Sequence, residues 1–152
     1  MQAKKNLGNT KENPSVGCII VKKDCVVGSG HTSINGRPHA EKNAISCLRK
    51  NDINCSIYVT LEPCSNFGKT SPCVNLISKK KFQEIFISIY DPDIRSFKKS
   101  IKKLKKKGIK VKIGVLSKKV KNFYNSYTIY KKKYFTFCDL QACCFKRFLY
   151  NK

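Results

Sequence analysis

Apolar runs long enough to cross a bilayer are missing from this 152-residue chain. A membrane-spanning helix needs about 18 or more apolar residues in succession, and residues 1–9 are polar, without the apolar stretch of a signal peptide. We therefore expect a soluble, cytoplasmic protein that does not bind membranes. In a reducing compartment, its nine cysteines are more often metal ligands or small core residues than disulfides.

Acidic residues and arginine are also scarce. Nine Asp and Glu stand against 32 Lys and Arg, which gives a formal charge of +23, and the excess is almost all lysine. Such a charge can indicate a nucleic-acid partner. However, the lysine runs at 79–81 and 105–107 lack the interleaved stacking aromatics of single-strand binders. We interpret the charge as a solvated surface, and we do not expect nucleic acid to be the partner.

The alternation of apolar and polar segments predicts an α/β fold. Strands are predicted over 17–21, 26–28, 56–61, 84–89 and 109–116, and helices over 39–50, 73–81 and 101–107. The order β-β-α-β-α-β-α-β favours one mixed central sheet covered by helices. From about residue 117 the pattern weakens. Residues 120–130 are compatible with a terminal helix, but we expect 126–152 as a whole to be an irregular tail.

Three short motifs carry metal-binding and acid-base side chains: His39-Ala40-Glu41, Pro63-Cys64 and Pro72-Cys73. Catalytic zinc takes three protein ligands and one open position, and one His with two thiolates supplies that set. Each ligand is predicted to lie at a helix start, where the backbone dipole favours a thiolate. Glu41 is too close to His39 to ligate comfortably, but it can touch a water molecule at the metal.

Each motif alone has a simpler explanation. His-Ala-Glu is common by chance, and an isolated cysteine is more often a small buried residue. Together, with a strand, a loop and a helix in the required order between them, the motifs predict a zinc site. A non-ligating Glu beside one His and two Cys ligands is the arrangement of the zinc deaminases.

Longer segments resemble one family, the deaminase domain of the bifunctional riboflavin-biosynthesis deaminase-reductases. The matching segments are Asn-Pro-Ser-Val-Gly-Cys at 13–18, Gly-Arg-Pro-His-Ala-Glu at 36–41, Tyr-Val-Thr-Leu-Glu-Pro-Cys at 58–64 and Gly-Lys-Thr-Ser-Pro-Cys at 68–73. The similarity runs from about Lys4 to Asn125. Eight residues separate Cys64 from Cys73, whereas two separate the corresponding cysteines of cytidine, adenosine and deoxycytidylate deaminases.

The resemblance implies a three-layer α/β/α cytidine-deaminase-like fold and a Zn²⁺ cofactor held by His39, Cys64 and Cys73. It also implies the reaction, the deamination of 2,5-diamino-6-(5-phosphoribosylamino)pyrimidin-4(3H)-one to 5-amino-6-(5-phosphoribosylamino)uracil. Zinc would lower the pKa of a water molecule towards neutrality. Glu41 would take its proton and pass it to the ring nitrogen and then to the departing amine.

The resemblance further assigns substrate contacts to Asn13, Lys69, Thr70 and Asp91. Asn13 would hold the pyrimidine edge, and a cation at Lys69 would suit a phosphorylated ribose. The chain departs from the family at three places. Thr32 stands where His is frequent, with His31 beside it, and Asp93 stands where Asn is frequent. A Gly-x-Gly segment is replaced by Ser-Phe-Lys at 96–98.

Two other functions are compatible with parts of the sequence. A nucleic-acid deaminase would fit the charge, but it would need the compact cysteine spacing and an open groove for a flipped base. An inactive fragment of a decayed bifunctional gene would fit the ends of the chain, since the family's first helix is truncated and no reductase domain follows. A homo-oligomer and a separate reductase partner are compatible with the sequence.

The domain boundary is predicted at residue 125, with a zinc-dependent deaminase domain over 1–125 and the tail over 126–152. After about Phe137 we consider two hypotheses for the tail. It is either a frameshifted start of the missing reductase domain or a disordered terminus. A one-base shift over 139–151 permits codons that restore the family's Lys, Ala, Ser and Asp spacing.

Overall fold

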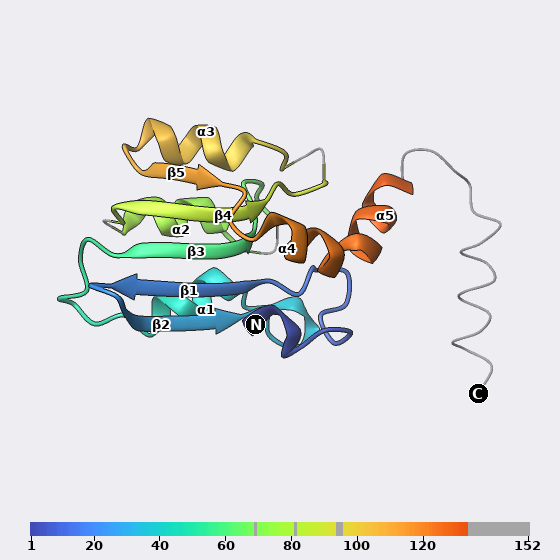
Figure 1. Ribbon diagram of the computed structural model, residues 1–152, viewed down its shortest axis with the longest axis horizontal. Helices are drawn as coiled ribbons and strands as arrows, with labels where there is room; N and C mark the ends of the chain where they lie inside the picture. The colour runs from blue at the N-terminus through green and yellow to red at the C-terminus, as the bar shows by residue number, and fades with distance from the viewer. Residues whose placement is uncertain (69, 81, 94–95, 134–152) are drawn as a thin grey trace.

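The computed structural model describes residues 1–68, 70–80, 82–93 and 96–133. A five-stranded sheet in the order β2-β1-β3-β4-β5 forms its centre (Figure 1). The strands are β1 (Gly17–Lys22), β2 (Cys25–His31), β3 (Ser56–Leu61), β4 (Glu84–Ile89) and β5 (Lys110–Ile113). β1 pairs antiparallel with β2 and β3, whereas β3, β4 and β5 run parallel to one another. The prediction of one mixed sheet is confirmed.

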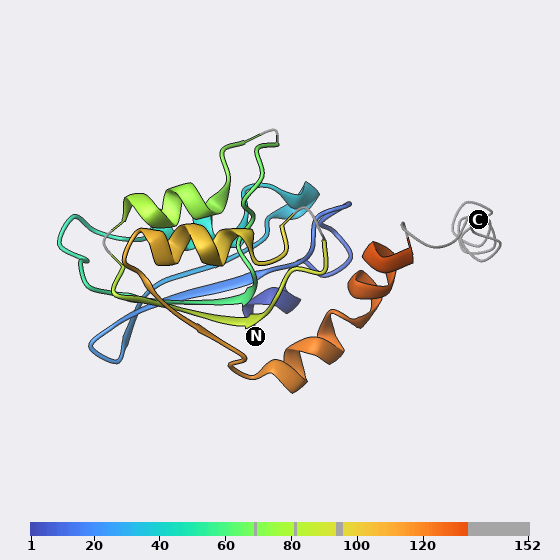
Figure 2. The same ribbon diagram turned by 90° about the horizontal axis from the view of Figure 1, so that it is seen from above.

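Helices lie on both faces of this sheet (Figure 2). One face is covered by α1 (Ala40–Ser46), α2 (Cys73–Lys79) and α3 (Lys99–Lys106). The other face carries a thinner layer, formed by the 3₁₀ helix η1 (Gln2–Lys4) and α4 (Ser117–Phe123), and α5 (Asn125–Lys133) continues past the end of the sheet. A second 3₁₀ turn, η2 (Ile34–Gly36), precedes α1. The expected three-layer α/β/α arrangement is therefore present.

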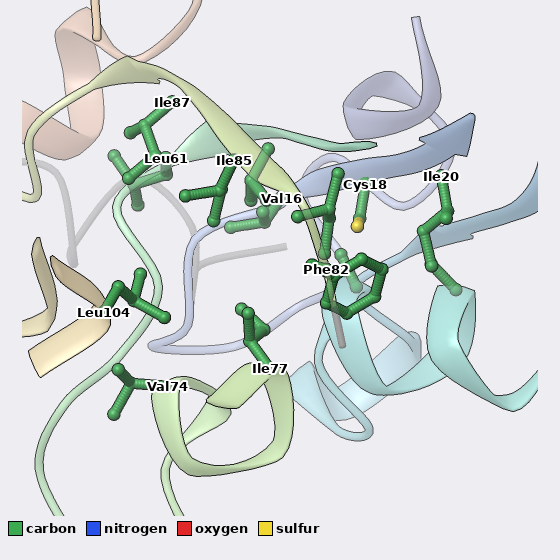
Figure 3. Packing of buried hydrophobic residues seen from close by; sticks show 14 of the residues in the cluster. Val16, Cys18, Ile20, Leu61, Val74, Ile77, Phe82, Ile85, Ile87 and Leu104 are labelled. Atoms are coloured by element: carbon green, nitrogen blue, oxygen red, sulfur yellow. The ribbon is translucent and has the colours of Figure 1, made fainter. Parts of the chain in front are cut away.

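The core lies between the sheet and α1–α3. In β3 and β4 every second side chain is buried, as expected for strands with one face against a core. Val74 and Ile77 of α2 and Leu104 of α3 pack over these strands, and all three are fully buried (Figure 3). This packing fixes the carboxyl ends of β3 and β4 and the start of α2.

Two glycines let β2 approach α1 closely. A Cβ atom at Gly30 would lie 2.3 Å from the carbonyl oxygen of Ala40 and 2.5 Å from the amide nitrogen of Ala44, and one at Gly28 would lie 2.6 Å from the Ala44 carbonyl oxygen. These contacts involve backbone atoms, which cannot rotate away as a side-chain end can. The absence of a Cβ here therefore sets the height at which α1 lies on the sheet.

We expect Gly30→Ala to lower the free energy of unfolding by about 1–3 kcal/mol, because the added methyl group must displace the backbone of α1. Denaturant unfolding of the purified chain measures this change. Ser29→Ala is the matched control, since Ser29 is the neighbouring residue and its side chain is exposed; a change within about 0.5 kcal/mol is expected there. Equal stability of the two variants would contradict the close approach.

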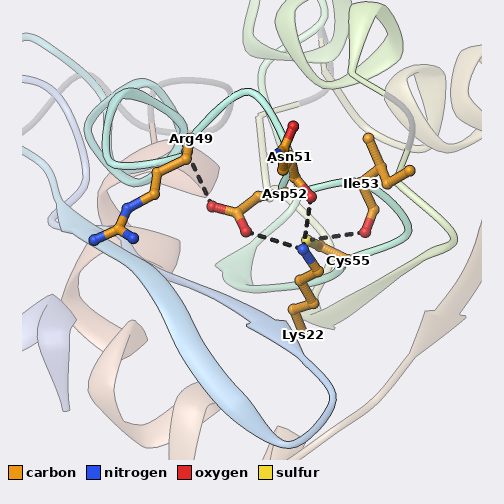
Figure 4. A network of polar contacts seen from close by, with 6 residues as sticks. All are labelled: Lys22, Arg49, Asn51, Asp52, Ile53 and Cys55. Atoms are coloured by element: carbon orange, nitrogen blue, oxygen red, sulfur yellow. Dashed lines mark hydrogen bonds and ion pairs between the residues drawn. The ribbon is translucent and has the colours of Figure 1, made fainter.

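A polar network stabilises the loop between α1 and β3, which precedes the amino end of β3 (Figure 4). Lys22 Nζ, at the end of β1, donates to the carbonyl oxygen of Asn51 at 2.6 Å and lies 3.2 Å from Asp52 Oδ1. Asp52 Oδ2 accepts the amide of Arg49 at 2.9 Å. These two contacts lower the pKa of Asp52, the Arg49 amide more than Lys22. The network is structural, because its residues lie away from the cavity described below.

The segment after β5 differs from the sequence prediction. Residues 126–133 belong to α5 and are helical, so the expectation of an irregular tail from residue 126 is wrong for this stretch. The chain turns between α4 and α5 at Tyr124, whose hydroxyl donates to the carbonyl oxygen of Ser15 at 2.9 Å and lies 2.8 Å from Thr60 Oγ1. The hypotheses for the tail after Phe137 fall outside the described residues.

Two other elements, β5 and α1, end earlier than predicted. β5 stops at Ile113, because Gly114 has a φ of +99° that ends the extended conformation. α1 stops at Ser46 rather than near residue 50. In the described part of the chain, none of the helices combines the length and the apolar character that crossing a membrane requires.

Candidate metal centre and active-site pocket

The three residues predicted as metal ligands converge at the carboxyl end of β3. His39 is the N-cap of α1, Cys73 is the first residue of α2, and Cys64 lies in the loop after β3. His39 Nδ1 is 3.4 Å from Cys73 Sγ and 3.7 Å from Cys64 Sγ. The three ligand atoms all lie within 4.8 Å of one another, so this cluster can hold a metal ion.

Cys64 is the one ligand that does not lie at a helix start, contrary to the sequence prediction. It is nevertheless held by the first turn of α2. The amide of Cys73 donates to Cys64 Sγ at 3.2 Å, and the amide of Val74 donates to the Cys64 carbonyl oxygen at 3.2 Å. Free amides at a helix start thus orient the loop cysteine.

The pKa values of the two cysteine thiols are shifted in opposite directions. Hydrogen bonding with Cys73 is the main cause that lowers the pKa of Cys64 to about 4, and His39 lowers it further. The same hydrogen bond, followed by burial, raises the pKa of the Cys73 thiol. One thiolate beside an imidazole and a second sulfur is a donor set that suits a soft divalent cation such as Zn²⁺. His39 Nε2 is buried and has no hydrogen-bond partner among the described residues.

Glu41 lies in the first turn of α1, two residues after His39, and only 3% of its surface is exposed. Burial is the main cause that raises its pKa, and the nearby Cys64 adds to the effect, whereas His39 opposes it. Its carboxylate is not part of the three-ligand cluster. A buried carboxyl group with a raised pKa beside a metal site is suited to accepting and returning a proton.

A cavity of about 580 Å³ opens in front of His39, Glu41 and Cys64. Three of the predicted substrate contacts, Asn13, Thr70 and Asp91, also line it. The structure thus brings together residues from four separate segments of the chain. The fourth predicted contact, Lys69, lies outside the described residues. The volume is within the usual range for a small-molecule site.

The structure also assigns places to two residues that the sequence left ambiguous. Thr32 is buried and lines the cavity, where its Oγ1 accepts the amide of Val16 at 2.9 Å and donates to the Pro14 carbonyl oxygen at 3.1 Å. It therefore holds the segment that follows Asn13. His31 is not among the described residues that line this cavity.

Several cavity residues were not predicted from the sequence. Arg37 donates to Thr70 Oγ1. In the sequence, functions were predicted only for His39 and Glu41 of the motif that also contains Arg37. Glu62 is buried and accepts the hydroxyl of Ser100 at 2.7 Å and the amide of Lys98 at 3.1 Å. It fixes the start of α3 beside the cavity. Lys99, Tyr127 and Lys131 also line the cavity.

Acidic side chains gather in this cavity although they are scarce in the chain. Five of the nine Asp and Glu residues line it, namely Glu12, Glu41, Glu62, Asp91 and Asp93. Among the described lining residues they outnumber the basic ones, which are Arg37, Lys99 and Lys131, so the charge balance of the cavity differs from that of the whole chain. This distribution disfavours a long polyanion in contact with the walls of the site.

The chain matches the family model for the cytidine and deoxycytidylate deaminase zinc-binding region over residues 1–89. It is 44% identical over 114 residues to a diaminohydroxyphosphoribosylamino-pyrimidine deaminase of Buchnera aphidicola. The aligned segment covers 75% of this chain and 78% of that protein. It is also 44% identical over 103 residues to the riboflavin biosynthesis protein RibD of Chlamydia muridarum, covering 68% of this chain and 28% of the relative.

Solved structures agree with these similarities. Acinetobacter baumannii RibD superposes with a TM-score of 0.81 at 34% identity, over 86% of this chain and 37% of that chain. A Thermotoga maritima deaminase and 5-amino-6-(5-phosphoribosylamino)uracil reductase gives a TM-score of 0.80 at 35% identity, over 87% and 38%. The chain thus spans about a third of the length of the RibD proteins that it matches.

Proposed function

Because this chain belongs to the cytidine and deoxycytidylate deaminase family, and within it to the deaminases of riboflavin biosynthesis, we propose that it deaminates a phosphoribosylated diaminopyrimidine. The substrate is 2,5-diamino-6-(5-phosphoribosylamino)pyrimidin-4(3H)-one and the product is 5-amino-6-(5-phosphoribosylamino)uracil. The observation that carries the proposal is the convergence of His39, Cys64 and Glu41 on one cavity that Asn13 and Thr70 also line.

In this proposal His39, Cys64 and Cys73 would hold Zn²⁺, which would act as a Lewis acid and lower the pKa of water towards neutrality. The carboxylate of Glu41 accepts the proton of the attacking water and delivers it to the ring nitrogen. In the resulting tetrahedral adduct the carboxylate then accepts the proton of the added hydroxyl group and passes it to the amino group, so that the C–N bond breaks, the carbonyl forms and ammonia leaves. Burial of Glu41 supports this role, because it brings the pKa of the carboxyl group closer to the working pH.

Asn13 is proposed to hold the pyrimidine edge. Its Nδ2 donates to the carbonyl oxygen of Gly36 at 3.3 Å, which leaves Oδ1 to accept a hydrogen bond from the substrate. Gly36 has a φ of +84°, and a Cβ there would lie 2.4 Å from Asn13 Nδ2. A glycine at position 36 thus permits both the turn before α1 and the orientation of Asn13.

The extended loop between the two cysteines is proposed to contact the phosphoribosyl group through Lys69 and Thr70. The hydrogen bond from Arg37 to Thr70 Oγ1 supports this assignment, since it brings a guanidinium group beside the loop. Guanidinium and ammonium groups are the usual protein partners of phosphate. The proposal therefore attributes selection for a phosphorylated substrate to this side of the cavity.

A comparison of three substrates tests the proposed function. The zinc-loaded chain is offered the diaminopyrimidine phosphate, cytidine and deoxycytidylate, and ammonia release is followed. We expect kcat/KM for the first to exceed that for the others by roughly hundredfold or more, because both others lack the 5-amino group of the diaminopyrimidine, and cytidine also lacks the phosphate, so that polar groups of the cavity remain unpaired. Preference for deoxycytidylate would contradict the substrate assignment. Inactivity towards all three would favour the inactive-fragment hypothesis.

A further inference from the structure

We propose that α5 is part of the active site, in which Tyr127 and Lys131 are positioning residues that hold Asp91 and Asp93 on the cavity wall. The proposal rests on the deaminase function and extends it to a segment beyond the residues that the family model matches. α5 lies past the carboxyl ends of β3 and β4 (Figure 1). Tyr127 and Lys131 both line the cavity.

Two side-chain contacts connect α5 to the loop after β4. Tyr127 Oη donates to Asp91 Oδ1 at 3.5 Å, and Lys131 Nζ lies 3.4 Å from Asp93 Oδ2. The side chains of Lys131 and Asp93 are only 20% and 13% exposed. Tyr127 and Lys131 are four residues apart, so one face of the helix makes both contacts.

The start of α5 is itself anchored to the sheet. Tyr124 is buried, and its hydroxyl bonds to Ser15 and Thr60 tie it to the segment before β1 and to β3. The rings of Tyr124 and Tyr127 pack with centroids 6.2 Å apart. The position of Tyr127 over the cavity is therefore set by contacts within the domain.

The contacts of the Asp91 side chain with Asp93 and Tyr127 both involve one of its oxygens. Asp91 Oδ1 accepts the amide of Asp93 at 2.9 Å as well as the Tyr127 hydroxyl. Asp91 also lines the cavity. A fixed carboxylate oxygen in this place accepts an N–H or O–H group of the substrate, which carries ribose hydroxyls and amino groups.

The charge balance at Asp91 depends on α5. Among the described residues, the charged and titratable groups that face Asp91 are Asp93 on its own loop, Glu62 after β3, Tyr124 before α5, and Tyr127 and Lys131 on α5. Burial is the main cause that raises the pKa of Asp91 to about 6; Asp93 and Glu62 add to this effect, whereas the Asp93 amide and Lys131 oppose it. Lys131 thus favours the deprotonated form that accepts a hydrogen bond.

The variants Lys131→Met, Asp93→Asn and their combination test this role. A carboxylate acceptor is lost as pH falls through its pKa. Removing the cation raises the pKa of Asp91, so Lys131→Met should move the acidic limb of kcat/KM to higher pH. Asp93→Asn removes a negative charge and should move the limb to lower pH. In the double variant the acidic limb should lie close to that of the unmodified chain, because both charges are then absent.

At pH 6.5 we expect Lys131→Met to lower kcat/KM by about tenfold, mainly through KM, since a hydrogen bond to a charged group is weakened. Lys121→Met is the matched control, because Lys121 is an exposed lysine of the preceding helix, and it should leave the profile unchanged. If the ion pair only stabilised the fold, Lys131→Met would lower the free energy of unfolding slightly and would not shift the pH profile. That result would overturn the proposal.

A titration without substrate keeps this inference separate from the proposed function. The ¹³C carboxyl resonance of Asp91 is followed with pH in the full chain, with Lys131→Met and with the double variant. A higher midpoint in Lys131→Met that reverts in the double variant supports the positioning role even if no ammonia is released. Identical midpoints in all three proteins would overturn it, whatever the deaminase assay gives.

Discussion

Replacement of Glu41 by Gln should lower the rate of ammonia release by at least about hundredfold, the usual contribution of a general acid-base residue. Gln has the size of Glu and can donate a hydrogen bond, but it cannot accept and return a proton. Glu41 is buried and stands outside the three-ligand cluster, so the variant should keep the zinc content of the unmodified chain. Steady-state ammonia release and elemental analysis measure the two quantities.

Glu12→Gln is the control for this experiment. Glu12 lines the same cavity, but its side chain is exposed and it has no assigned role in proton transfer. Its substitution should leave turnover close to that of the unmodified chain. Near-normal turnover of zinc-loaded Glu41→Gln would remove Glu41 from the mechanism.

The second large effect concerns the metal. Cys64→Ala and Cys73→Ala should each reduce zinc from about one ion per chain to nearly none, because two remaining ligands no longer form the three-residue set of a catalytic site. Elemental analysis after dialysis measures the loss. Cys55→Ala is the control, since Cys55 is a buried cysteine outside the cluster. Full zinc occupancy in both ligand variants would refute the site.

Removal of the metal should also lower thermal stability. An ion that binds only the folded chain stabilises it by about 2.7 kcal/mol when its free concentration is a hundredfold above Kd. A chelator should therefore lower the melting temperature of the unmodified chain and of Cys55→Ala. It should have little effect on Cys64→Ala, which has no metal to lose.

Local patterns in the sequence were sufficient for most of the sheet. β3 and β4 begin and end at the predicted residues, because strict alternation of buried and exposed side chains leaves little freedom of register. α1 ended earlier than predicted because the residues after it form a turn, in which Asp52 accepts the amide of Arg49. Helix-forming residues alone do not reveal such a competing contact.

The candidate site was predictable where it depends on short motifs. His39, Glu41, Cys64 and Cys73 were identified from their order and spacing, and the structure places them together. The helix start predicted at Cys64 was wrong, whereas the one predicted at Cys73 agrees with the first residue of α2. The residues that follow Cys64, Ser-Asn-Phe-Gly, instead continue as a loop.

Side-chain contacts between distant segments could not be predicted. Tyr127 and Asp91 are 36 residues apart, and neither the composition nor the periodicity of 125–133 indicates that this helix reaches the cavity. Arg37 was overlooked for a similar reason, because its partner Thr70 lies 33 residues further along the chain. Such contacts depend on the three-dimensional arrangement of the loops at the carboxyl end of the sheet.

Ammonia release and zinc content, measured on the same preparations of the full chain, show whether the His39, Cys64 and Cys73 cluster is a catalytic zinc centre. Preparations with different zinc occupancies are given the diaminopyrimidine phosphate as substrate. We expect ammonia release to rise in proportion to zinc, to reach its maximum at about one ion per chain, and to be lost with a chelator and restored by added zinc. A chain that holds one zinc ion and releases no ammonia from this substrate would contradict this expectation.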